Sequence, residues 1–152
     1  MNRLFLLVLF GFLSLCVFGQ TPNSNYDEEL AKELGADDYG MKKYIFVILK
    51  TGTNKTEDKA FIDSCFAGHL SNIKRLVEEQ KLIVAGPFFE NEKDYRGLFI
   101  LNVDTKEKAI EILKSDPAIK EDLLSSELFE WYGSAALPLY LEASDKVWKI
   151  GY

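Results

Sequence analysis

Apolar side chains recur along residues 43–132 with the two spacings that distinguish strands from helices. The first run, KYIFVILK at 43–50, is continuously apolar, which is typical of a strand covered on both faces. The elements that follow are a long amphipathic helix at 57–80, strands at 81–85 and 97–103, a helix at 105–114 capped by Thr105, a short helical turn before Leu124, and an alternating edge strand at 126–132. This β-α-β-β-α-β order predicts an α+β, ferredoxin-like domain over residues 41–133.

The same strands predict a second layer over the sheet. Helices in a βαββαβ unit cover one face, yet the strands at 43–50 and 97–103 are apolar on both faces. An exposed apolar face of that size is typical of an interface. Two such sheets facing each other across a two-fold axis would cover it, so we expect a homodimer through the sheet face.

The first nineteen residues have the pattern of a secretory signal. Arg3 precedes an apolar run that ends at Gly19, and the run is short for a membrane span. The sequence therefore predicts a signal peptide at 1–19 and an exported protein, periplasmic or secreted. Two alternatives are an uncleaved membrane anchor and a lipoprotein acylated at Cys16, against which Leu15 argues because a small residue is expected there.

Two further segments flank the predicted domain. Residues 20–40 form an acidic leader with a helical face that ends at Gly35, and it serves as a docked segment or as a spacer. Residues 134–152 contain the apolar stretch LPLYL and Trp148. We expect this extension to pack against the domain or against the partner.

Composition and charge exclude several classes of protein. The 152 residues are 47% apolar, 13% aromatic and 28% charged, which suits one packed domain and excludes a disordered chain or a disulfide scaffold. A net charge of −6 without a basic stripe argues against nucleic-acid binding. After removal of residues 1–19, one histidine and one cysteine remain, which cannot form a conventional zinc site, and no phosphate-binding or dinucleotide-binding loop occurs. We therefore expect no metal and no cofactor, with a small organic molecule as the ligand.

The single histidine is the first candidate for chemistry. His69 lies in the apolar stripe of the long helix, four residues after Cys65, so its side chain should point toward the sheet. Imidazole is well suited to proton transfer near neutral pH. By position alone, however, a hydrogen-bonded core histidine is the more common outcome. Cys65 would need an open, electropositive pocket to act as a nucleophile, and core packing explains it better.

Two stretches, GHLSNIKRLVEEQKLIVAGPF at 68–88 and RGLFILNVDTKEKAIEILKSDPA at 96–118, resemble the YCII-related domain family. They match its His-Leu pair on the first helix, a strand ending in Gly-Pro, a strand beginning at Gly, and an Asp-Pro after the second helix. The likeness covers about residues 42–132, and the flanking segments look like features of an exported subgroup. It implies a dimeric α+β barrel with an active site built on a paired histidine and aspartate. Some relatives are dehydrochlorinases of chlorinated hydroxyquinols, but no residue here identifies that substrate.

The resemblance implies that His69 and Asp116 form this pair. Asp116 precedes a proline and also fits a helix N-cap with Pro at the first helical position, which requires no chemistry. One carboxylate can serve both purposes, if one oxygen caps the helix and the other orients the imidazole as a general acid or base.

Four further residues are candidates for binding a substrate beside the pair: Gly86, Pro87, Tyr132 and Ser134. The first two end a strand, where little side-chain bulk lets a ligand approach. Gly-Pro is, however, equally common as an ordinary strand end with no role in binding. The last two leave the final strand in a hydroxyl-bearing stretch. Tyr95 and Arg96 could contact an anion from the hairpin loop, where a solvated position is the simpler interpretation.

Two functions of different classes follow from these residues. One is an enzyme in which the His-Asp pair performs acid-base chemistry, of elimination or isomerisation type, on an organic molecule in an apolar pocket. The other is a non-catalytic ligand-binding or dimeric assembly module in which the pair is structural. A pocket open to solvent beside His69 favours the enzyme, whereas a sealed imidazole favours the module.

Overall fold

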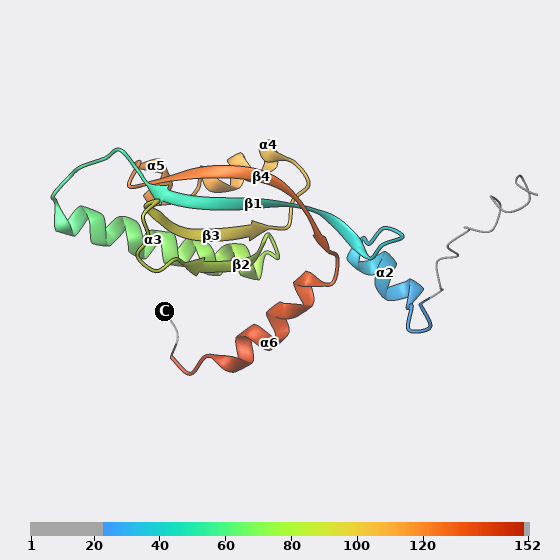
Figure 1. Ribbon diagram of the computed structural model, residues 1–152. Coiled ribbons are helices and arrows are strands. Elements are labelled where there is room, and N and C mark those ends of the chain that lie inside the picture. The colour runs from blue at the N-terminus through green and yellow to red at the C-terminus, as the bar shows by residue number, and fades with distance from the viewer. Residues whose placement is uncertain (1–22, 151–152) are drawn as a thin grey trace, which may run out of the picture.

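The computed structural model describes residues 23–150, so the predicted signal at 1–19 and Cys16 lie outside the described residues. Four strands form one antiparallel sheet in the order β2-β3-β1-β4 (Figure 1). The strands are β1 (Met41–Thr51), β2 (Leu82–Pro87), β3 (Tyr95–Leu101) and β4 (Leu124–Ser134). The helices between them are α3 (Lys59–Glu78), α4 (Lys106–Leu113) and α5 (Pro117–Lys120). Element order and strand order are those of the ferredoxin-like fold, which confirms the predicted α+β class.

The strand at 81–85 was expected to stop before Gly86, but β2 continues through Pro87. Gly86 pairs with Leu98, and Pro87 pairs with Gly97. Proline is tolerated there because β2 is an edge strand, where the missing N–H costs no hydrogen bond on the outer side. As a result, both residues lie on the sheet rather than in the loop that follows.

The core lies on one side of the sheet. Alternate residues of β1 and β3 point to that side and pack against all three helices between the strands. The buried cluster contains Ile45, Val47, Leu49, Phe99 and Leu101 from the strands, and Ile73, Leu76, Ala109, Leu113 and Ala118 from the helices. Thr105 caps α4 through its hydroxyl, as its position in the sequence predicted.

The opposite side of the sheet is apolar and, around Phe46 and Ile48, open in the single chain. Tyr44, on the same side of β1, is fully buried beside Trp131. Register places Phe46 between Ile100 of β3 and Phe129 of β4, and Ile48 opposite Leu98. Phe129 is 47% exposed, and Phe46, Ile48, Leu98 and Ile100 are half-buried. Within residues 23–150 the part of this face around Phe46 and Ile48 stays partly exposed, and the expected homodimer stays a prediction.

The flanking segments differ in how they meet the domain. Helix α2 (Glu28–Leu34) ends at Gly35 in the left-handed conformation, as predicted, and the Asp37 carboxylate accepts a hydrogen bond from the Tyr132 hydroxyl. After β4, the 3-10 helix η1 (Leu137–Leu139) leads into α6 (Tyr140–Val147), which extends away from the sheet (Figure 1). No residue of α6 is buried, so packing of the extension on the domain or a partner stays a prediction. Within the described chain, no helix is long and apolar enough to cross a membrane.

Candidate active site

A close approach of two helices creates the site. A Cβ added to Gly68 of α3 would lie 2.7 Å from Cγ of Pro117, the first residue of α5. Glycine at this position therefore lets the two helices touch. The contact brings His69, the next residue of α3, beside Asp116, the residue that precedes α5.

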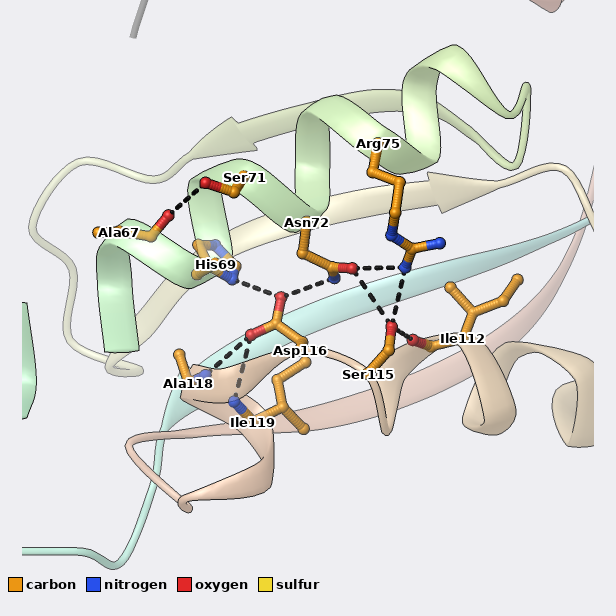
Figure 2. Close-up of polar contacts among 10 residues, drawn as sticks. All are labelled: Ala67, His69, Ser71, Asn72, Arg75, Ile112, Ser115, Asp116, Ala118 and Ile119. Carbon is orange, nitrogen blue, oxygen red and sulfur yellow. Dashed lines mark hydrogen bonds and ion pairs between the residues drawn. The ribbon is translucent and has the colours of Figure 1, made fainter. Parts of the chain in front are cut away.

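Asp116 uses its two carboxylate oxygens for two different tasks (Figure 2). Oδ1 accepts hydrogen bonds from the backbone N–H groups of Ala118, at 3.0 Å, and Ile119, at 3.3 Å, and so caps α5. Oδ2 lies 2.7 Å from Nδ1 of His69. The side chain is fully buried. A single carboxylate therefore makes both predicted interactions, the helix cap and the contact with the imidazole.

Asn72 also binds the carboxylate of Asp116, and Arg75 and Ser115 hold Asn72 in place (Figure 2). Asn72, one turn along α3 from His69, donates through Nδ2 to Oδ2 of Asp116 at 3.2 Å. Its own Oδ1 accepts a hydrogen bond from Arg75 at 2.7 Å and one from the Ser115 hydroxyl at 3.2 Å. The amide of Asn72 is therefore fixed in one orientation, with its donor side toward the carboxylate.

Burial raises the pKa of Asp116, but the hydrogen bond and positive charge of His69, the amide of Asn72 and the N–H of Ile119 outweigh it and hold the pKa below its usual value. The carboxylate is therefore ionised at neutral pH and acts only as an acceptor. It follows that Nδ1 of His69 carries a proton, and that in the neutral ring Nε2 is the acceptor.

The imidazole ring is fixed on both sides by aromatic rings. It stacks on Phe99 of β3, with ring centroids 5.8 Å apart and an interplanar angle of 21°, and meets the edge of Phe66 at 6.2 Å. Nε2 has no hydrogen-bond partner within residues 23–150. Every fully buried side-chain nitrogen or oxygen in this part of the chain does have a partner, so Nε2 is not among the fully buried atoms. Nε2 is therefore not sealed in the core and is accessible from the adjoining cavity.

That cavity, of about 380 Å³, lies between α3 and the helix side of β1, β2 and β3. Its wall is mainly apolar, with Leu49, Phe66, Leu70, Ile73, Phe99 and Leu124, and with the small strand residues Ala85, Gly86, Pro87 and Gly97. His69 and Arg96 are its two residues with polar side chains. A cavity of this size and character is typical of a site for a small organic molecule.

The structure brings together four of the six residues predicted for the site. His69 contacts Asp116, and Gly86 and Pro87 line the cavity beside them. Tyr132 and Ser134 lie elsewhere. Because β4 runs antiparallel to β1, they pair with Lys43 and Met41, at the opposite end of β1 from Leu49 in the cavity wall.

Several residues of the site were not anticipated from the sequence. Asn72 could have been found, because it is a polar residue three positions after His69 on the buried side of a helix. Ser115 and Arg75 gave no such signal, since each is polar in an exposed stretch. Cys65 is buried and does not line the cavity, which agrees with core packing.

Within residues 23–150, no three histidine, cysteine, aspartate or glutamate side chains are grouped as possible metal ligands.

In comparisons with known proteins, no family model and no curated protein matches this chain. One solved structure similar to it is the 5-chloro-2-hydroxyhydroquinone dehydrochlorinase TftG from Burkholderia phenoliruptrix AC1100, in complex with 2,5-dihydroxybenzoquinone. The two are 22% identical, with 57% of this chain and 92% of that chain covered and a TM-score of 0.41. The similarity is too distant to bear on the chemistry of this chain.

Proposed function

We propose that this protein is an enzyme in which His69 serves as general base and acid toward a small organic molecule bound in the cavity. The supporting observation is the division of the imidazole between two environments. Nδ1 is held by the buried, ionised Asp116, while Nε2 is accessible from an apolar cavity. A base needs this combination of a fixed ring and an accessible nitrogen.

In the proposed reaction, Nε2 accepts a proton from a C–H group of the bound molecule. In an elimination, the electron pair of that bond forms a C=C bond while the leaving group departs with its own pair. In an isomerisation, the pair moves onto a conjugated carbonyl, and the same nitrogen returns the proton to another carbon. In either case the imidazolium formed is stabilised by the negative charge of Asp116 at 2.7 Å.

Proton abstraction can be measured before the natural substrate is known. Small cyclic ketones and hydroxylated aromatic compounds that raise the melting temperature are incubated with the protein in D₂O, and their C–H signals are followed by NMR. We expect His69→Gln to slow exchange at least about 100-fold. Ser71→Ala, which alters an exposed hydroxyl on the same helix, should leave exchange unchanged. Exchange that survives His69→Gln contradicts the proposal, and binding without exchange in the wild type supports the non-catalytic ligand-binding module instead.

We also propose that the chain is an exported member of the YCII-related domain family. The motifs at 68–88 and 96–118, and the contact between His69 and Asp116, support membership. The pattern of residues 1–19 supports export.

We further propose that two copies associate through the open face of the sheet. Supporting this, apolar side chains of three strands are continuous across the face, with Phe46 and Ile48 in its middle. Burial of such a surface stabilises association by about 25 cal/mol for each Å² removed from water. A two-fold axis would place the same apolar face of a second copy against this one, so that each sheet covers the other.

A further inference from the structure

Arg96 is unusual among the residues of the cavity. It is the one wall residue with a permanent charge, and its guanidinium makes no hydrogen bond or ion pair in the part of the chain that the structure describes. Arg75, by contrast, binds Glu79, Asn72 and Ser115. Arg96 is exposed to solvent, so its five N–H donors are available to a ligand that enters the cavity.

A β-bulge gives Arg96 its place in the wall. Leu49 of β1 lies opposite Gly97 of β3, whereas the next residue, Lys50, lies opposite Tyr95, so Arg96 is an extra residue on β3. In regular alternation, Arg96 and Gly97 would face opposite sides of the sheet. A bulge redirects the side chain at the irregular position, and here both residues line the cavity.

The neighbouring glycine lets β2 and β3 approach each other closely at this end of the cavity. A Cβ on Gly97 would lie 2.8 Å from the carbonyl oxygen of Gly86 on the adjacent strand. Arg96 and Gly97 both line the cavity at this end. Along the same wall lie the aromatic rings of Phe66 and Phe99 and the accessible Nε2 of His69.

We infer that the cavity binds small organic anions, with a flat apolar body against the aromatic wall and a carboxylate or phenolate on the guanidinium of Arg96. Guanidinium and carboxylate form paired, charge-assisted hydrogen bonds, whereas a neutral amide of the same shape cannot replace them. The inference deepens the proposed function, because it names the class of substrate presented to His69, but the anion site itself does not require catalysis.

The test compares benzoate with benzamide, which has the same shape and no charge, and with inorganic phosphate, which has charge and no apolar body. Binding is followed through the ring signals of the single histidine and by titration calorimetry. We expect benzoate to bind about tenfold more tightly than benzamide, and phosphate to bind more weakly than benzoate. Arg96→Gln should abolish the preference for benzoate. Lys93→Gln, with the same loss of charge in the same hairpin, should retain it.

Equal binding of benzoate and benzamide to the wild type would overturn the inference, as would absence of binding by both. So would a preference that survives Arg96→Gln, or phosphate binding as tight as that of benzoate. His69→Gln separates the two proposals. A preference that persists in this variant, together with absent proton exchange in the wild type, would leave the anion site standing and refute the catalytic role.

Discussion

Replacing Asp116 with asparagine changes one carboxylate oxygen into an amide nitrogen and keeps the other oxygen. The retained oxygen can still accept from the N–H groups of Ala118 and Ile119, so the cap of α5 is preserved. The new amide nitrogen faces two donors, Nδ1–H of His69 and Nδ2 of Asn72. His69 can relieve its part of the conflict only by moving its proton from Nδ1 to Nε2.

The magnitude follows from the bonds that are lost. Hydrogen bonds to a charged partner contribute about 1.5–3 kcal/mol each, and a buried donor left unpaired costs about 1–3 kcal/mol. Asn72 cannot invert its amide without losing the bonds that Arg75 and Ser115 donate to Oδ1. Since His69 regains one neutral bond, we expect the free energy of unfolding to fall by about 2–4 kcal/mol, and the melting temperature by roughly 8–16 °C.

Urea unfolding and the ¹⁵N shifts of the single imidazole measure these two effects. In the wild type Nδ1 should carry the proton, and in Asp116→Asn it should be Nε2. Asp104→Asn, at an exposed aspartate paired with Lys108, is the matched control and should alter neither. An unchanged stability of Asp116→Asn, or a proton that stays on Nδ1, would refute this account of the site.

Acid unfolding provides a second measurement on the same variant. Because the folded protein holds the pKa of Asp116 below its ordinary value of 3.8, the ionised carboxylate stabilises the fold fully above that value. This stabilisation is lost as the pH falls through the lower pKa of the folded state. Asp116→Asn has no such group, so the difference in stability between wild type and variant should shrink below about pH 4. A difference that stays constant down to about pH 2 would contradict the lowered pKa.

The remaining predictions concern the helix contact and the sheet face. Gly68→Ala should lower the free energy of unfolding by about 1–3 kcal/mol in urea titrations, although alanine is the better helix former, because its Cβ overlaps the ring of Pro117; a stabilised variant would show that the helices can separate freely. Phe46→Glu should convert the expected dimer into monomers in analytical ultracentrifugation, whereas Ile110→Glu, at an exposed apolar residue of α4, should not. A monomeric wild type would contradict the proposed association.

The order and type of the elements could be predicted because each depends on local spacing. The continuous apolar run of β1, the stripe of α3 and the Thr105 cap all describe contacts within a few residues of the chain. The helix cap at Asp116 was equally local, since Asp-Pro has one common conformation at a helix start. Its contact with His69, 47 residues earlier, followed from the topology and from the resemblance to a family.

The details that decide which side chains share a cavity were not local. The bulge that brings Arg96 to the cavity depends on register against β1, and no feature of the β3 sequence reveals it. Tyr132 and Ser134 were predicted to line the cavity, but they lie at the other end of the sheet. Because β4 runs antiparallel to β1, its last residues pair with the start of β1. The position of Gly68 against Pro117 likewise depends on how two helices cross.

The double use of the Asp116 carboxylate has a consequence for how this protein can change over evolutionary time. Under the proposed function, a lineage that lost the acid-base chemistry could replace His69 with another residue that fills the same volume. It could not as readily replace the aspartate, because the start of α5 depends on Oδ1 whatever Oδ2 contacts. On the proposed function, descendants that lost the activity should retain Asp116 and lose His69, so the imidazole would mark the proposed activity among distant sequences.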